Sequence, residues 1–425
     1  MSMMTEPEFT AGRAEGQPSE QRVIELHSAR DSWSIPNIGN WTRLMLSVAP
    51  SIEKGKLTIV LPDGRAVRSG SKPGRDGTMV MRNERVAKRL LTGGSLSFAE
   101  SYMDGDWVSP DIGALTEWAC QNEALDDTLE GKLWFRVLRR ALFMLARNSK
   151  RGSRRNIAYH YDLGNSFYAQ WLDPGMTYSS ASYEHAGQSL QVAQDNKFRR
   201  LLDVVNPKPG QKILEIGCGW GGFACFAARE RDVQVHGITI SREQFDYAQK
   251  RAFEAGLADK VTFEMRDYRD VTGAYDGIVS IEMFEAVGEA YWPTYFNKIN
   301  QCLKPEGRAA LQLIAIADKY FEAYRSSMDF IQKYIFPGGM LPSPSVFRRE
   351  AGKSGLVVED EYFFRNNYAD TLLEWRKKFM AAWPVIEPMG FDDRFRRMWE
   401  YYLAYCEGGF RGGTIDVMQV ALRHR

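Results

Sequence analysis

The sequence predicts an α/β protein with a mostly parallel sheet and a smaller mixed α/β domain at its N-terminus. Three observations support this fold class. The chain has 425 residues, more than one domain usually needs. From about residue 157, short apolar β-branched stretches alternate with helical ones, which is typical of a parallel sheet covered by helices on both faces. A glycine-rich loop closes the first of these strands, and the predicted strands are 212–217, 233–240, 261–267, 275–283 and 307–316.

The chain is predicted to divide into four parts. Residues 1–22 are rich in Gly, Glu, Ser and Pro and are expected to be a disordered tail. Residues 23–130 would form the N-terminal domain, in which 57–68 has the pattern of a hairpin turning at Asp63-Gly64. A basic segment, 131–156, would link it to a catalytic domain over 157–425.

The composition limits the possible locations and partners. Net charge is +1, so no global field favours nucleic acid. The five cysteines contain no CxxC pair and predict no disulfide framework, which fits a reducing cytoplasm. No apolar run approaches the roughly 20 residues of a membrane span. The histidines do not cluster, so no metal site is predicted. The expected location is therefore the cytoplasm or the inner face of a membrane.

The segment 131–156 predicts contact with a membrane surface. Between Lys132 and Arg155 there are nine Lys or Arg residues and no acid. Its leucines and Trp134 could share one helical face. A basic amphipathic helix of this kind is typical of a surface that rests on anionic lipid. An inter-domain helix with a solvated basic face is the alternative interpretation.

The glycine loop "LEIGCGWGGF" (214–223) indicates a nucleotide-like ligand. Its glycines follow a strand and open a helix, where free N–H groups are available. A site for NAD would need an acid about 20 residues later, but the second strand ends at Thr239 without one. Glu215 at the start of the loop is instead typical of S-adenosylmethionine sites. Asp267, after the third strand, is placed to accept a hydrogen bond from an adenine amino group.

Several motifs of the chain resemble those of the cyclopropane-fatty-acyl-phospholipid synthases. The resemblance covers nearly the whole chain beyond the tail, and its motifs occur in the family's order. It implies a class I methyltransferase (Rossmann-like) core of seven strands with an appended lipid-interacting N-terminal domain. It also implies transfer of the methyl group of S-adenosylmethionine to an acyl-chain double bond of a membrane phospholipid. The motifs lie at 90–107, 160–179, 213–223, 237–244, 267–271, 283–288, 303–307 and 333–343.

The resemblance assigns two sets of site residues. With Glu215 from the loop, the cofactor-binding residues would be Tyr161, Ser179, Gly217, Gly219, Thr239, Gln244 and Asp267. In the family a bicarbonate ion serves as the base, and the matching positions here are Ser180, Glu285, Gln312, Ile314 and Tyr368. Two of these depart from the pattern, because the family has Cys at Ser180 and His at Gln312. Bicarbonate is therefore a possible second cofactor, held by an altered site.

Two carboxylates stand where the fourth strand should end, in "SIEMFEAVG" (280–288). Glu285 is expected to anchor the base or to meet a carbocation by its charge. Glu282 is expected to bind cofactor or to cap the next helix. The aromatic stretch 398–410 is predicted to be a helix that either closes an acyl tunnel or packs in the core.

The predicted product depends on which proton leaves the methylated chain. Loss from the new methyl group closes a cyclopropane ring, which is the expected outcome. Loss from a neighbouring chain carbon gives a methyl-branched alkene, which is a close alternative. Two other classes remain, namely a methyltransferase of a small soluble acceptor and a non-catalytic lipid-binding protein. The resemblance also suggests a homodimer.

Overall fold

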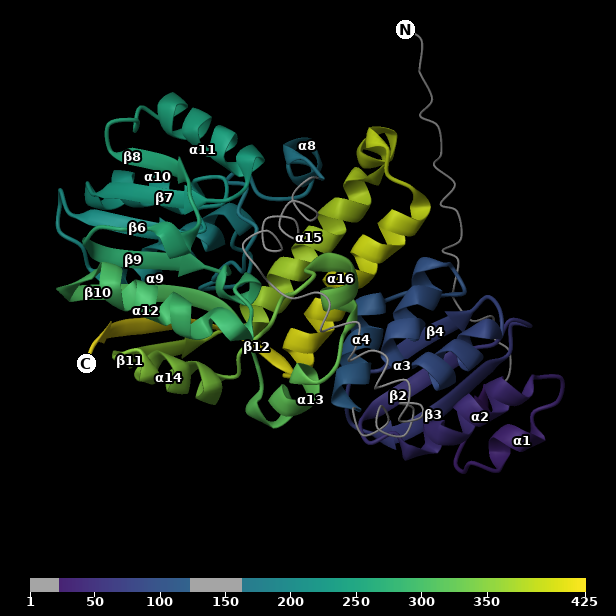
Figure 1. Cartoon of the computed structure of the whole chain (residues 1–425). Coiled ribbons are helices and arrows are strands. Elements are labelled where there is room, and N and C mark those ends of the chain that lie inside the picture. Colours follow the sequence, from purple (N-terminus) through teal and green to yellow (C-terminus); the bar gives the residue numbers. More distant parts are fainter. Residues whose placement is uncertain (1–22, 123–162) are drawn as a thin grey trace, which may run out of the picture.

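The computed structural model describes residues 23–122 and 163–425, which form two sheets linked by a bundle of helices (Figure 1). The predicted tail 1–22, the basic segment 131–156 and the proposed boundaries at 130 and 156 lie outside the described residues. Among the described residues, no helix is both long and apolar enough to cross a membrane.

The larger sheet confirms the predicted fold class. Its seven strands have the order β11-β12-β10-β9-β6-β7-β8, and only β12 runs antiparallel to its neighbours. All five predicted strands are present, and each end lies within four residues of its expected position. The strands are β6 (Lys212–Ile216), β7 (Gln234–Thr239), β8 (Val261–Met265), β9 (Tyr275–Ile281), β10 (Leu303–Ile316), β11 (Leu356–Phe363) and β12 (Ile415–His424).

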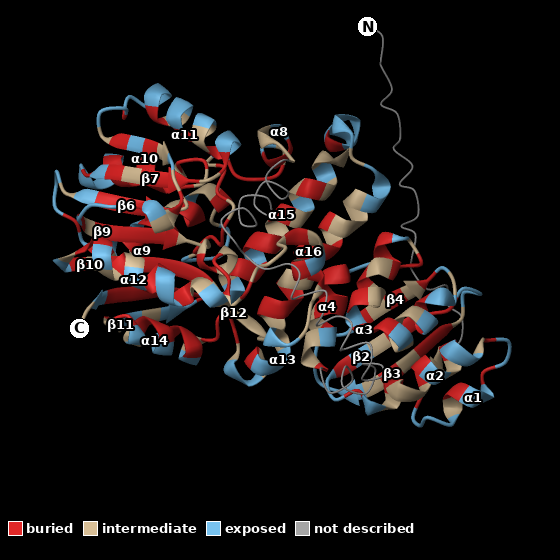
Figure 2. Cartoon of the chain, in the orientation of Figure 1, coloured by how far each residue is buried: buried red, intermediate tan, exposed pale blue. Residues whose placement is uncertain are grey.

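Helices cover both faces of this sheet because its strands are apolar on both sides. Within β6, Ile213 packs into one buried cluster and its neighbour Leu214 into another. The first cluster includes residues of α9 (Leu190–Val205), α10 (Gly222–Arg231) and α11 (Arg242–Glu254), and the second includes residues of α12 (Trp292–Cys302) and α14 (Pro344–Lys353). Figure 2 shows the strands largely buried and the outer surface of α11 exposed.

The smaller sheet belongs to the N-terminal unit, which contains both strands and helices as predicted, and its strand pairs are parallel in part and antiparallel in part. Its order is β1-β3-β2-β4-β5, and the predicted hairpin is formed by β2 and β3 around Gly64, which has a φ of 89°. Its strands are β1 (Ile24–Glu25), β2 (Gly55–Val60), β3 (Ala66–Lys72), β4 (Gly77–Met81) and β5 (Trp107–Val108). Its helices are α1 (Asp31–Ser34), α2 (Asn40–Val48), α3 (Arg85–Met103) and α4 (Ile112–Gln121).

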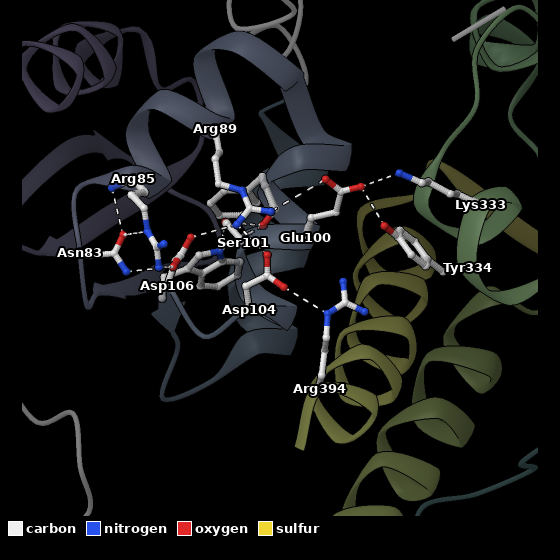
Figure 3. Close-up of polar contacts among 12 residues, drawn as sticks. Asn83, Arg85, Arg89, Glu100, Ser101, Asp104, Asp106, Lys333, Tyr334 and Arg394 are labelled. Carbon is white, nitrogen blue, oxygen red and sulfur yellow. Dashed lines mark hydrogen bonds and ion pairs between the residues drawn. The ribbon is translucent and has the colours of Figure 1, made fainter. Parts of the chain in front are cut away.

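Two long helices join the units. Helix α16 (Asp393–Gly412) packs against α15 (Arg365–Ile386) on one side and against α3 and α4 on the other, as Figure 1 shows. One hydrophobic cluster therefore extends from the N-terminal sheet through these helices to β12. Polar pairs cross the same contact, including Asp104–Arg394 at 3.1 Å and Glu100–Lys333 at 2.6 Å (Figure 3).

Candidate active site

A cavity of about 670 Å³ lies beyond the carboxyl ends of β6, β7 and β9. That edge is where ligands of parallel sheets bind. One region of the cavity is formed by the glycine loop, and the other walls are mainly apolar and come from both units. Apolar lining residues of the N-terminal unit include Met45, Leu90, Phe98, Trp107 and Trp118. The volume is in the range of sites for cofactors and drug-sized ligands.

The glycine loop leaves room for a ligand against its backbone. Gly217 and Gly219 have φ values of 82° and 50°, which side chains other than glycine rarely adopt. A Cβ atom added to Gly217 would lie 2.8 Å from Met283, whereas one added to Gly219 would meet no atom within 4 Å. Helix α10 begins directly afterwards at Gly222, so the positive end of its dipole lies next to the loop.

Glu215 offers an unpaired carboxylate oxygen next to the loop. The side chain is buried, and its Oε2 atom has no hydrogen-bond partner among the described residues. Burial raises the pKa of Glu215 well above its usual value. An ammonium group such as that of S-adenosylmethionine would satisfy this oxygen and favour its charged form. Together with the open space at Gly219, this fits the cofactor.

The other predicted cofactor residues gather around the same end of the cavity. Thr239 donates to Gln244 Oε1 at 2.9 Å, which joins the end of β7 to the start of α11. Asp267 is buried, and its two oxygens accept hydrogen bonds from the backbone N–H and the guanidinium group of Arg269. All three predicted residues line the cavity, as does Ser179. Tyr161 lies outside the described residues.

The carboxylate of Glu282, in the cavity wall, accepts three hydrogen bonds from other segments of the chain. Its Oε1 atom accepts from the Ser180 N–H and from Gln312 Nε2, both at 2.8 Å. Its Oε2 atom accepts from the Tyr368 hydroxyl at 2.6 Å. Three of the residues expected to hold an anion thus converge on Glu282. Ser180 and Gln312 are buried behind it, whereas Glu282 and Tyr368 line the cavity.

The backbone of Glu282 explains this convergence. Glu282 follows β9 directly and has a φ of 49°, the left-handed region that is unusual for a residue other than glycine. Its N–H donates to the Gln312 carbonyl at 2.7 Å, so Gln312 contacts both ends of the residue. Gln419 on β12 donates to Gln312 Oε1 at 2.9 Å, which turns the Gln312 amide nitrogen toward Glu282.

Glu285 lies close by in a different environment. Its Oε1 atom accepts from the Ile314 N–H at 2.6 Å, and its buried Oε2 atom has no partner among the described residues. Burial, and secondly the charge of Glu282, raise the pKa of Glu285 to about 8. Glu285 is therefore mainly protonated at neutral pH. Burial also raises the pKa of the neighbouring Glu282, although the charge of Lys197 and the three donors oppose that rise.

Lys197 is a functional candidate that the sequence did not reveal. It lies on α9, is fully buried and donates to the Ser179 hydroxyl at 2.6 Å. Burial lowers its pKa to about 7, although the charges of Glu282 and Asp173 oppose that shift. Lys197 thus connects the cofactor side of the site with the acids. A lysine in a polar helical stretch usually predicts an exposed face, so no sequence signal marked it.

Aromatic side chains close the cavity on the side of α16. The helix predicted over 398–410 is confirmed, and four of its aromatic residues line the cavity: Tyr401, Tyr402, Tyr405 and Phe410. The ring of Phe410 stacks on Tyr368 with 4.5 Å between centroids. Such faces stabilise positive charge in a site that excludes water.

The sheet order, the glycine loop and the surrounding acids define a class I S-adenosylmethionine-dependent methyltransferase. More specifically, the chain belongs to the mycolic acid cyclopropane synthetase family, whose model matches residues 148–420. This confirms the resemblance drawn from the motifs and the predicted enzyme class.

Named relatives show how far the similarity extends. Tuberculostearic acid methyltransferase UfaA1 of Mycobacterium tuberculosis is 39% identical over 377 residues, which is 86% of this chain and 87% of the relative. Cyclopropane-fatty-acyl-phospholipid synthase of Escherichia coli is 38% identical over 349 residues, 80% and 86% of the two chains. The crystal structure of mycolic acid cyclopropane synthase CmaA1 complexed with SAH and CTAB has a TM-score of 0.60 at 29% identity, covering 63% of this chain and 97% of that one. Together they place the chain among lipid methyltransferases.

Proposed function

We propose that the protein methylates the double bond of an unsaturated acyl chain in a membrane phospholipid. One observation carries this proposal, namely that a single cavity extends from the glycine loop to apolar walls supplied by both units. S-adenosylmethionine supplies an electrophilic methyl group at the loop end. An acyl chain would lie along the apolar walls, and a small polar acceptor would leave most of those walls without a partner.

The chain's own residues meet the needs of this reaction. Methylation of an alkene leaves a carbocation, which water would trap as an alcohol. The buried aromatic wall of α16 keeps water away and offers ring faces to the cation. The acids after β9 supply negative charge and a place for the proton that must leave. Tyr368 belongs to both groups, because it stacks on Phe410 and hydrogen-bonds to Glu282.

Cyclopropane formation is the proposed outcome. The acids lie next to the loop that would hold the methyl donor, since Met283 contacts the position of Gly217. A base at that end is close to the newly added methyl group, and removal of a methyl proton closes the ring. A methyl-branched alkene is the second candidate, favoured by the relative named for tuberculostearic acid, a methyl-branched fatty acid.

Product analysis tests the proposal. Purified protein is incubated with S-adenosylmethionine carrying a labelled methyl group and vesicles of unsaturated phospholipid, and the recovered acyl chains are examined by proton NMR. Upfield cyclopropane signals are expected. A vinylic proton beside a new methyl group would instead support the branched product. Recovered lipid that carries no labelled methyl group would contradict both products.

We also propose that the basic segment 131–156 brings the enzyme to anionic membranes at the inner face. Its nine cations and no acids between Lys132 and Arg155 support this proposal. Co-sedimentation with vesicles of anionic lipid, but not with neutral vesicles, is the expected result, and it should weaken as salt is raised. A homodimer is also proposed, and analytical sedimentation of the enzyme without vesicles tests it.

A further inference from the structure

The residues expected to hold a bicarbonate ion are already occupied by side chains of the protein. The Ser180 N–H, the Gln312 amide and the Tyr368 hydroxyl all donate to Glu282. The remaining backbone donor, the Ile314 N–H, is used by Glu285. A small anion placed here would find none of these donors free and would face two carboxyl groups. The site therefore does not fit bicarbonate.

The carboxylate of Glu282 has the position and the bonds that such an anion would need. It lines the cavity and accepts hydrogen bonds from three of the five positions matched to the anion site. Its Oε1 atom accepts two of them and its Oε2 atom only one. Since each carboxylate oxygen can accept two, Oε2 retains a lone pair for a proton.

We propose that Glu282 is the resident general base of the reaction and makes a dissociable bicarbonate unnecessary. This inference rests on the proposed function. In the step, a C–H bond of the methylated acyl cation breaks, and its electron pair forms the ring C–C bond or a new double bond. The proton is transferred to Glu282 Oε2, which becomes a neutral acid. Glu282 returns the proton to water when the product leaves.

Neighbouring residues act through Glu282. Gln312 and Ser180 do not line the cavity, so they are positioning residues that hold Oε1. The charge of Lys197 favours the charged form of Glu282. Glu285 is mainly protonated at neutral pH and accepts one hydrogen bond, whereas Glu282 accepts three, which favour its charged form against the effect of burial.

Two substitutions at Glu282 test whether its side chain fills an anion site. One opens the site, and the other keeps it filled by a side chain that cannot act as a base. Glu282→Gly removes the carboxylate, leaves its donors in place and suits the left-handed backbone. Glu282→Gln keeps the shape of the side chain but cannot take a proton. Both are expected to lower turnover by about 10²–10⁴-fold. In buffer free of CO2, added bicarbonate or formate should restore turnover to Glu282→Gly but not to Glu282→Gln, and wild-type turnover should not respond.

A binding measurement gives a second readout that needs no turnover. Formate and bicarbonate should raise the melting temperature of Glu282→Gly, because they bind the freed donors of the folded state, and should leave that of the wild type unchanged. The exposed Glu254→Gln serves as a matched control that should behave as wild type in both assays. The isosteric Glu282→Gln keeps the test valid if the glycine variant fails to fold.

Several outcomes would overturn the inference. They are wild-type turnover that requires added bicarbonate, a Glu282→Gln enzyme with normal turnover, or a folded glycine variant that does not bind either anion. If the wild type transfers no label to lipid at all, the proposed function fails instead. The melting experiment then still decides whether the Glu282 position is an anion site.

Discussion

One buried acid and one partly buried acid in this protein are held in opposite ways. Asp106, in the N-terminal unit, is inaccessible to solvent and accepts from the guanidinium groups of Arg85 at 2.6 Å and Arg89 at 3.1 Å (Figure 3). Glu282 in the catalytic cavity accepts from a backbone N–H, an amide and a hydroxyl, all of them neutral donors.

The difference separates a structural acid from a reactive one. Two guanidinium groups hold Asp106 through charged hydrogen bonds, and both ion pairs depend on this one side chain. Neutral donors hold Glu282 in place, and the charge of Lys197 acts on it without replacing any of those donors. Its Oε2 atom accepts only one hydrogen bond. The acid with the charged partners belongs to the fold, whereas the acid with neutral partners is suited to exchange a proton.

Removing the structural acid should have the largest effect on stability. Asp106→Ala leaves Arg85, Arg89 and Asn83 without their shared acceptor. The loss of these hydrogen bonds to a charged group should cost about 1.5–3 kcal/mol, because the freed Arg85 side chain is 73% exposed and water solvates it. Urea unfolding measures the loss. Asp104→Ala, whose side chain is 36% exposed, is the matched control and should cost less than half as much. Equal losses of unfolding free energy in the two variants would show that burial of Asp106 does not determine its contribution to stability.

Removing one donor from Glu282 should lower turnover per folded molecule. In Gln312→Leu, Glu282 Oε1 loses one donor, and a positioning residue of this kind is worth about 10–100-fold in activity. Because the lost donor favoured the charged form, the pKa of Glu282 should rise and the acid limb of the turnover–pH profile should move to higher pH.

The control for this variant is Gln234→Leu, at the exposed start of β7 far from the carboxyl ends of the strands. Its turnover and pH profile should match the wild type. A Gln312→Leu enzyme with reduced turnover but an unshifted profile would contradict the role given to the amide.

The sequence predicted the fold because local signals and the global architecture agree. Alternating apolar and helical stretches located five of the strands, and the glycine loop located the cofactor end through conformations that only glycine adopts easily. The partners of Glu282 were not predictable in this way. They come from segments 30 to 102 residues distant, and a left-handed backbone at Glu282 decides which acid they reach. The burial of Lys197 was not predicted, because the acids whose charges favour a buried lysine, Glu282 and Asp173, lie elsewhere in the sequence.

Protonation of Glu285 should make the free energy of unfolding of the protein decrease as pH rises. Its folded pKa of about 8 lies above the ordinary value of 4.5, so the folded state binds more protons between these values. Stability is then greatest at low pH and falls as pH rises through that window, by about 1.4 kcal/mol per pH unit for one group.

Glu285→Gln should remove that contribution. Urea unfolding at pH 5.5, 6.5 and 7.5 should show a stability difference between variant and wild type that grows with pH in favour of the variant. The exposed Glu254→Gln should give a constant difference. A constant difference for Glu285→Gln as well would mean that Glu285 is charged in the folded protein.

The smallest effect is expected at the exposed pair that joins the two units. Glu100 accepts from Lys333 at 2.6 Å and from Tyr334 at 2.8 Å, and the lysine and glutamate side chains are 39% and 21% exposed. A double-mutant cycle with Glu100→Gln and Lys333→Met should give a coupling of about 0.2–1 kcal/mol that weakens in high salt. Turnover per folded molecule should stay at the wild-type level. A salt-independent coupling of several kcal/mol would instead place this pair with Asp106, as an ion pair on which the fold depends.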